Sequence, residues 1–346
     1  MELISTDFSI PVANHAGFKA RIDAIQIAED VGFKHVVING TAGNNRVTRL
    51  AHSYLEIFHL KRKIQDADEG IVFAQYPFDA NYFNRRFFLH AFARTKLLKV
   101  LLVHDLNSIR GLNKIKEQSE VDIFNQFDVV IAHTPEMVEF LRDAGVSAKL
   151  MTLKIFDYLI ANQGQMEADE VPKKIFFAGN LKKSHFLDDL SMSQGIKLIA
   201  YGPAGPNQAF SENVDYQGVL PPDRIPSKLK KGWGLVWDGD SSQGLDNRLG
   251  NYLRIISPHK ASLYLASGIP VIAPTNSAVG HFIQQNKVGI TINNLSELDK
   301  KISKLNSEDW KLIEYNVGKW QSRLTEGLQL KSVLRDILED LPNRQI

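Results

Sequence analysis

Short apolar segments alternate with amphipathic segments along almost the whole chain. Apolar runs such as "KVLLVH" and "KIFFAG" have the length of β-strands. Between such runs, apolar side chains recur at helical spacing, as they do over residues 22–31. Strands this apolar are covered on both faces, which is typical of parallel sheets with helices on either side. The pattern therefore predicts an α/β protein with a doubly wound parallel sheet.

A polar stretch at residues 161–172, "ANQGQMEADEVP", interrupts this alternation. It has no periodicity and ends in proline, as linkers between domains do. The alternation then restarts, and 346 residues exceed what one core of ordinary size needs. We therefore expect one Rossmann-like domain over residues 1–160 and a second over 173–325. We expect the helical segment 326–346 to cross back onto the first domain.

Local signals place several helices. Thr134 and Pro135 have the residue types of an N-cap and a first helical position. We also expect a helix near residues 183–191 and another over "DRIPSKLKK", residues 223–231.

Composition narrows the class of protein. Apolar residues make up 44% and charged residues 23% of the chain, and the net charge of +2 gives no reason to expect binding to nucleic acid. The chain has no cysteine, which excludes disulfides, zinc–cysteine sites and thiol nucleophiles. Its apolar runs are far shorter than the ~20 residues that cross a bilayer. We expect a soluble, cytoplasmic protein with at most peripheral membrane contact.

The segment "SPHKASLYLASG" combines a predicted helix with an unusual first turn. Pro258, His259 and Lys260 begin the helix, which ends at Gly268. A helix start presents unpaired N–H groups and about half a positive charge, so it attracts anions and disfavours a cation. Lys260 at that position indicates a bound anion such as a phosphate. The alternative is a surface lysine whose charged head extends into solvent.

Two more strand ends carry candidate chemistry. In "FFAGNLKKS", Gly179 and Asn180 would let a ligand approach the backbone, and Lys183 could reach a phosphate, although such glycines also serve turn geometry alone. In "VLLVHDLNS", His104 and Asp105 could bind an acceptor hydroxyl or remove its proton. The alternative there is a hydrogen-bonded core histidine followed by a capping aspartate.

The segment "WDGD" is similar to the Asp-X-Asp motif with which some glycosyltransferases hold a divalent cation. Because Asp238 and Asp240 follow a late strand beside a glycine-rich loop, we interpret them as the start of that loop and expect no metal site. The chain lacks the glycine-rich dinucleotide motif, the Walker loop and the nucleophile elbow of serine hydrolases.

Residues 230–292, from "KKGWGLVWDG" to "NKVGITI", resemble the C-terminal half of the glucosyltransferase 3-like family. These are bacterial GT-B enzymes that extend glycans on serine-rich adhesins, and some relatives are labelled galactofuranosyltransferases. "FFAGN" and "VDYQG" follow the family more loosely, as do the N-terminal "HD" and "VGF" segments. The resemblance implies two Rossmann-like domains that face each other across a cleft, with the acceptor on the first and the nucleotide sugar on the second.

The resemblance also implies an activity. It implies a metal-independent hexosyltransferase without a cofactor, which moves glucose, N-acetylglucosamine or galactofuranose from a UDP-sugar to a bacterial glycan on a protein or lipid-linked acceptor. We also expect a homo-oligomer. By motif match, the nucleotide contacts fall on Ala16, Gly179, Asn180, Lys183, Tyr216, Pro258, His259, Lys260, Ala261, Ser262 and Leu263.

Two positions depart from the family, and a third departs from many GT-B transferases. Lys183 stands where the family has arginine, which keeps the charge but loses the bidentate fork. Ala16 replaces a residue with a hydroxyl group, and His281 stands where many GT-B transferases have a glutamate.

The chemistry expected from these residues has two parts. Lys260 would stabilise the charge that develops on leaving UDP, and His104 or Asp105 would be the base on the acceptor side. Two alternatives remain: a GT-B-type nucleotide-sugar epimerase, and a non-catalytic partner of another glycosyltransferase that binds the sugar nucleotide without turnover.

Overall fold

The computed structural model describes residues 1–8, 16–39, 46–78, 82–110, 117–161, 170–192, 195–238, 241–245 and 247–341. The chain forms two compact units. The first consists of Met1–Ala13, Arg21–Leu153 and Leu330–Ile346, and the second of Asn14–Ala20 and Lys154–Gln329. Most of the expected linker, residues 162–169, lies outside the described residues.

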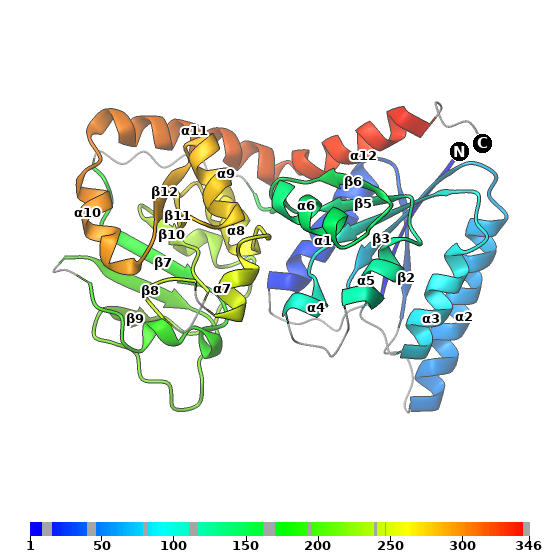
Figure 1. Ribbon diagram of the computed structural model, residues 1–346, viewed down its shortest axis with the longest axis horizontal. Coiled ribbons are helices and arrows are strands. Elements are labelled where there is room, and N and C mark those ends of the chain that lie inside the picture. Colours follow the sequence, from blue (N-terminus) through cyan, green and yellow to red (C-terminus); the bar gives the residue numbers. More distant parts are fainter. Residues whose placement is uncertain are drawn as a thin grey trace. The chain divides into compact units, whose positions relative to one another are not determined.

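The first unit contains a six-stranded sheet in the order β2-β1-β3-β4-β5-β6, and all its neighbouring strands are parallel. The strands are β1 (Glu2–Phe8), β2 (Lys34–Ile38), β3 (Gly70–Tyr76), β4 (Leu98–Val103), β5 (Val129–Ala132) and β6 (Lys149–Thr152). The helices are α1 (Ala16–Asp30), α2 (Arg46–Gln65), α3 (Tyr82–Phe92), α4 (Asn107–Arg110), α5 (Glu117–Phe124), α6 (Pro135–Asp143) and most of α12 (Leu328–Asp340). Figure 1 shows these helices around the sheet.

The second unit contains another parallel six-stranded sheet, in the order β12-β11-β10-β7-β8-β9. Its strands are β7 (Lys174–Ala178), β8 (Lys197–Tyr201), β9 (Val214–Tyr216), β10 (Trp233–Leu235), β11 (Val271–Pro274) and β12 (Gly289–Ile292). Its helices are α7 (Arg248–Tyr252), α8 (His259–Ala266), α9 (Ala278–Asn286), α10 (Leu298–Ser303) and α11 (Ser307–Thr325), with four short 3₁₀ turns.

Each sheet has a topological switch point, where successive strands are added first on one side of a central strand and then on the other. In the first unit, β2 lies on one side of β1 and β3 on the other. In the second, β8 lies on one side of β7 and β10 on the other. Open α/β sheets bind ligands beside the carboxyl ends of the strands at such switch points. The topology therefore predicts that ligands bind beside the residues that follow β1 and β3 in the first unit, and β7 and β10 in the second.

Local predictions of helices were right in one place and wrong in two. The Thr134 hydroxyl accepts a hydrogen bond from Met137 N at 3.1 Å and Pro135 begins α6, which confirms the predicted start. The helices predicted over 183–191 and 223–231 are wrong, because the chain forms only 3₁₀ turns there: Leu181–Lys183, His185–Leu187 and Pro226–Lys228.

The residues themselves explain both errors. The Ser184 hydroxyl donates to the Asn180 carbonyl at 3.3 Å, so a side chain competes with the helical backbone bonds. Pro226 lacks an N–H group and restricts the residue before it.

Candidate functional site

α8 begins at the switch point of the second sheet. Its first residue is His259, one position later than predicted, and Pro258 is the N-cap. Proline has no side-chain acceptor, so Pro258 makes no capping hydrogen bond to the first turn of α8. Among the N–H groups of that turn, Ala261 N donates to the Pro258 carbonyl at 3.0 Å. The His259 ring stacks on Phe156, with centroids 4.3 Å apart.

Lys260 is held close to the ends of β7 and β10. Its amine donates to Asp238 Oδ1 at 2.6 Å and to the Trp237 carbonyl at 3.1 Å, and it lies 4.5 Å from the centre of the Phe177 ring. The exposed fractions are 15% for the lysine side chain and 29% for the aspartate side chain. Lys260 is therefore not a surface lysine that extends into solvent.

The glycine turns after β7 and β8 lie beside this lysine. A Cβ atom built on Gly179 would be 3.5 Å from Lys260 Cε. Gly202 has φ +139°, and a side chain there would overlap the Gly179 carbonyl, so the two turns can meet only because residue 202 is glycine. The Tyr216 hydroxyl donates to the Gly202 carbonyl at 3.1 Å. The structure thus brings Gly179, Lys260 and Tyr216 into one connected region.

The other predicted nucleotide contacts in this unit differ in accessibility. Lys183 is exposed on the first 3₁₀ turn, and Asn180 Oδ1 caps that turn by accepting from Lys182 N at 3.2 Å. The side chains of Ala261, Ser262 and Leu263 are buried, so only their backbone could face a ligand. Ser262 Oγ is buried without a hydrogen-bond partner among the described residues, a state that is uncommon for a hydroxyl.

Tyr264, which was not predicted, fixes α8 over the switch point. Its hydroxyl accepts from Ala178 N at 2.9 Å and donates to the Leu235 carbonyl at 3.2 Å, so it joins the ends of β7 and β10. The ring fits because residue 234 is glycine, where any Cβ atom would overlap it. Burial raises the pKa of the Tyr264 hydroxyl, which keeps it neutral.

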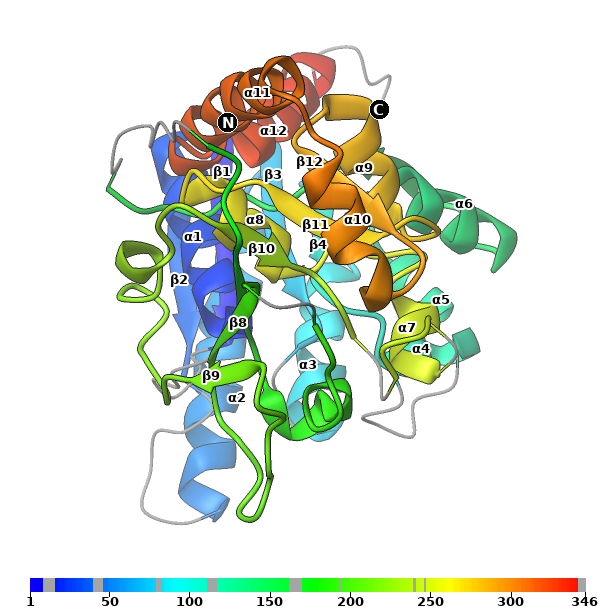
Figure 2. The same ribbon diagram turned by 90° about the vertical axis from the view of Figure 1, so that its left-hand side faces the viewer.

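The outer side of α8 is covered by α11, as Figure 2 shows. Gln321 Nε2 on α11 donates to the Ala266 carbonyl at 3.3 Å. α8 is therefore held on both sides, by the sheet through Tyr264 and by α11 through Gln321.

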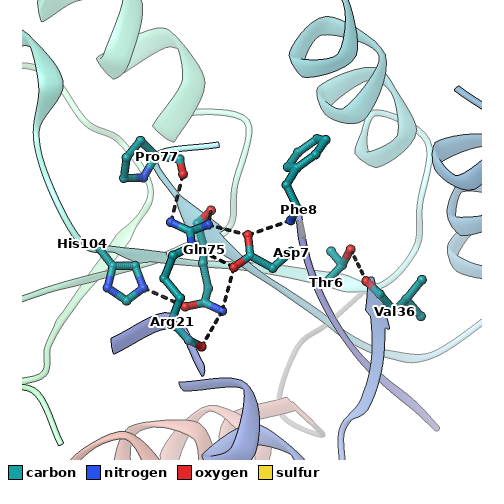
Figure 3. A network of polar contacts seen from close by, with 8 residues as sticks. All are labelled: Thr6, Asp7, Phe8, Arg21, Val36, Gln75, Pro77 and His104. Carbon is teal, nitrogen blue, oxygen red and sulfur yellow. Dashed lines mark hydrogen bonds and ion pairs between the residues drawn. The ribbon is translucent and has the colours of Figure 1, made fainter. Parts of the chain in front are cut away.

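The first unit has a polar network at its own switch point (Figure 3). Asp7, near the end of β1, forms an ion pair with Arg21 on α1 and accepts from Gln75 Nε2 on β3 at 3.3 Å. The Gln75 Oε1 atom lies 2.7 Å from Nε2 of His104, the residue after β4. All four side chains are buried. Burial raises the pKa of Asp7, and the Arg21 guanidinium opposes this effect.

The network assigns the protonation of His104. Gln75 Nε2 donates to Asp7 and to the Arg21 carbonyl, so the Oε1 atom of Gln75 faces His104 and must accept. Nε2 of His104 therefore carries the proton, and Nδ1 is the basic nitrogen of the neutral ring. Gln75 has a signal in the sequence, because it is a polar residue inside the otherwise apolar strand β3, whereas β1 around Asp7 contains several polar residues.

The remaining predicted residues, Asp105 in the first unit and Ala16 in the second, have different outcomes. Asp105 forms an ion pair with Arg110, and its side chain is 27% exposed, whereas His104 is only 8% exposed. Asp105 is thus the more accessible of the two candidate bases. Ala16 begins α1 but its side chain lies outside the described residues, as does the loop before it.

Two further features concern metal ligands and membrane spans. Within the described ranges, no group of three or more histidine, aspartate or glutamate side chains could hold a metal ion. Asp238 pairs with Lys260, and Asp240 lies outside those ranges. No helix in the described part of the chain is both long enough and apolar enough to cross a membrane.

A solved structure defines the class of fold. The Anabaena protein Alr3699/HepE, determined in complex with UDP-glucose, superposes with a TM-score of 0.61 at 14% identity, covering 99% of this chain and 100% of its own. Two parallel Rossmann-like units of this kind are the GT-B fold of glycosyltransferases.

Family models match both halves of the chain. The model "Glucosyltransferase 3-like, N-terminal domain" matches residues 6–155, and "Glucosyltransferase 3-like, C-terminal domain" matches residues 175–337. The chain belongs to the glucosyltransferase 3-like family, which confirms the resemblance seen in the sequence.

Two curated relatives give the enzyme class. Beta-1,6-galactofuranosyltransferase WbbI of Escherichia coli (strain K12) is 27% identical over 95% of this chain and 96% of its own length. Glucosyltransferase 3 of Streptococcus gordonii is 25% identical over 75% of this chain and 77% of its own. The protein is a glycosyltransferase.

Proposed function

We propose that the protein is a metal-independent hexosyltransferase that uses a UDP-sugar. It transfers glucose, N-acetylglucosamine or galactofuranose to a hydroxyl group of a growing bacterial glycan on a glycoprotein or a lipid-linked acceptor. The observation that carries the proposal is the Lys260 amine, held over the glycine turn after β7 at the switch point of the second sheet. The names of the two relatives support a hexosyl group, and the neighbour solved with UDP-glucose supports a uridine diphosphate donor.

In this proposal the donor diphosphate lies against the first turn of α8. The positive end of the α8 helix dipole and the Lys260 amine supply positive charge without a metal ion. The bond between the sugar C1 and the phosphate oxygen breaks, and its electron pair stays on UDP. Because the negative charge on UDP grows as the bond breaks, Lys260 stabilises the transition state more than the bound substrate.

The acceptor side of the proposed reaction lies in the first unit. The acceptor oxygen forms the new bond to C1 and its proton passes to a base. For an inverting reaction we propose Asp105 or Nδ1 of His104 as that base, with Gln75 holding the histidine ring in orientation.

A donor screen followed by a transfer assay tests the proposal. A UDP-sugar present at ~100 times its dissociation constant adds ~2.7 kcal/mol to the stability of the native state, so the right donor raises the melting temperature. We expect this shift in the presence of EDTA, and release of UDP only when an acceptor glycan is added. An isomerised sugar without acceptor would indicate an epimerase, and donor binding with no transfer would indicate a non-catalytic partner.

A further inference from the structure

Exposed apolar side chains are concentrated on one helix pair of the first unit. α2 and α3 lie side by side (Figure 1), and their Tyr54 and Phe87 rings meet edge to face with centroids 4.9 Å apart. Thirteen large apolar side chains are exposed among the described residues, and six lie on these two helices of 20 and 11 residues. The six, called the α2–α3 face below, are Val47, Tyr54, Leu55, Phe58, Phe83 and Phe87.

α2 carries two apolar stripes, and the unit uses only one of them for its core. The buried stripe has helical spacing and consists of Ile57, Leu60 and Ile64, with the buried Ser53 one turn before them. A second stripe with similar spacing, made by residues 47, 51, 54 and 58, is exposed. It is offset by one residue, which is about 100° around a helix. The second stripe therefore has no role in the core of its own unit.

The same two helices are strongly basic. α2 and α3 contain seven lysine or arginine residues and a single glutamate, so their net charge is +6. The whole chain has a net charge of +2, and all other residues together therefore carry −4. Arg85, Arg86 and His90 line a groove of about 870 Å³ on α3 together with Phe83 and Phe87. Positive charge and exposed aromatic rings thus occupy one surface.

We propose that the α2–α3 face binds the surface of a membrane that contains anionic lipids. Basic side chains are attracted to the negative potential of such a surface, and aromatic rings insert at the level of the lipid headgroups. Self-association through this face is disfavoured, because a two-fold interface would bring two basic helix pairs against each other. The proposal goes beyond the transfer reaction and does not depend on it.

Sedimentation with vesicles tests the proposal on the intact chain. The wild-type protein should bind vesicles of phosphatidylglycerol and phosphatidylcholine, but not pure phosphatidylcholine, and binding should weaken in high salt because surface charges are then screened. Arg62→Gln, one helical turn after Phe58 on α2, combined with Arg86→Gln on α3 should weaken binding about thirtyfold at low salt. Phe58→Ser with Phe83→Ser should weaken it about tenfold. The matched controls are Lys300→Gln with Lys301→Gln, and Tyr315→Ser, all at exposed positions of the second unit.

A second measurement uses the absence of cysteine, because a single introduced cysteine can be labelled uniquely. Phe58→Cys, labelled with a polarity-sensitive fluorophore, should shift to shorter wavelength when anionic vesicles are added, whereas labelled Tyr315→Cys should not. Absence of wild-type binding to anionic vesicles, or equal shifts for both labels, would overturn the proposal. The proposal would also be overturned if variants of the α2–α3 face abolished an oligomer seen by light scattering and left vesicle binding unchanged.

Discussion

The amine of Lys260 lies 2.6 Å from Oδ1 of Asp238, so the cation at the start of α8 is paired with the carboxylate that follows β10. In the sequence these residues belong to two unrelated patterns, a lysine in a helical first turn and an Asp-X-Asp segment. A bound diphosphate would compete with Asp238 for the amine. Because of this competition, we expect substitutions of the two residues to change UDP affinity in opposite directions.

Lys260→Met should weaken UDP binding ten- to a hundredfold, because a charged contact to a diphosphate is worth roughly 1.5–3 kcal/mol. The melting temperature should also fall slightly, since Asp238 and the Phe177 ring lose their partner. Titration calorimetry measures the first effect and differential scanning calorimetry the second. Lys197→Met is the control for the loss of one exposed charge. Lys197 is the first residue of β8, whereas the glycine turn near Lys260 follows the end of that strand. Unchanged UDP affinity in Lys260→Met would remove the phosphate site from this helix.

Asp238→Asn should strengthen UDP binding about fivefold in the presence of EDTA. Asparagine can still accept the hydrogen bond from Lys260, but it carries no negative charge. The repulsion between the Asp238 carboxylate and the diphosphate, which costs ~1 kcal/mol even when water screens it, is therefore removed. A metal-dependent enzyme would behave in the opposite way. There, EDTA would abolish UDP binding to the wild type, manganese would restore it, and Asp238→Asn would bind UDP more weakly.

Tyr264→Phe should destabilise the second unit by roughly 1–3 kcal/mol, because Ala178 N–H and the Leu235 carbonyl lose their buried partner. UDP affinity should fall as well, since the hydroxyl holds the start of α8 between β7 and β10. Urea unfolding and UDP titration test the two effects, with exposed Tyr315→Phe as the control. If stability fell but UDP affinity did not, Tyr264 would support the fold without positioning a binding site.

Local patterns in the sequence were sufficient for most of the fold. β3 is buried at every position and α2 spans Arg46–Gln65 as its periodicity indicates, because strand and helix signals are contained in consecutive residues. The helix expected over 183–191 failed because the Ser184 hydroxyl competes for the backbone. That competition depends on a single side-chain rotamer, which periodicity does not encode.

The candidate site was predicted only in part, since its contacts depend on strand order. Lys260 and Asp238 are 22 residues apart and meet because α8 packs against β10. Lys260 lies beside Gly179 because β7 is the neighbour of β10, an order that apolar runs do not reveal. The Gln75–His104 contact likewise depends on β3 and β4 being neighbours. Sequence patterns could predict His104 and Lys260 as candidate site residues but could not predict which residues they contact.

Gln75→Leu should lower turnover and leave UDP affinity nearly unchanged. The substitution removes the acceptor of the His104 Nε2 proton, so the ring can rotate and Nδ1 loses its orientation. His104→Ala and Asp105→Asn should also act on turnover, because both residues lie in the first unit and UDP is proposed to bind the second. Steady-state kinetics with varied donor and varied acceptor separates these effects. Loss of UDP affinity in proportion to activity would assign the residues to the donor instead.

A second measurement must distinguish a specific effect of Gln75→Leu on His104 from general damage to the fold. If His104 is the base, the pH–rate profile of the variant should shift, whereas partial unfolding would lower activity equally at every pH. A uniform loss across the profile would limit Gln75 to a structural role.

His133 should make the protein less stable in mild acid. The side chain is buried after β5, where its Nε2 atom donates to the Val103 carbonyl at 2.8 Å, and burial lowers its pKa to about 4 from an ordinary 6.5. Between these values the unfolded chain binds a proton that the folded chain does not, so stability is present above pH 6.5 and is lost as pH falls toward 4. The loss amounts to roughly 3 kcal/mol, since one pKa unit corresponds to about 1.4 kcal/mol.

The measurement is the difference in unfolding free energy between the wild type and His133→Gln, which cannot titrate, at several pH values. Other acidic groups titrate in both proteins and cancel in this difference. We expect a constant difference above pH 6.5 and a steady change in favour of the variant between pH 6.5 and 4. His52→Gln, at an exposed position of α2, is the control for the replacement of a histidine by glutamine. If the His133→Gln difference were the same at every pH, the histidine would be protonated as readily in the folded protein as in the unfolded chain, and its burial would not control its charge.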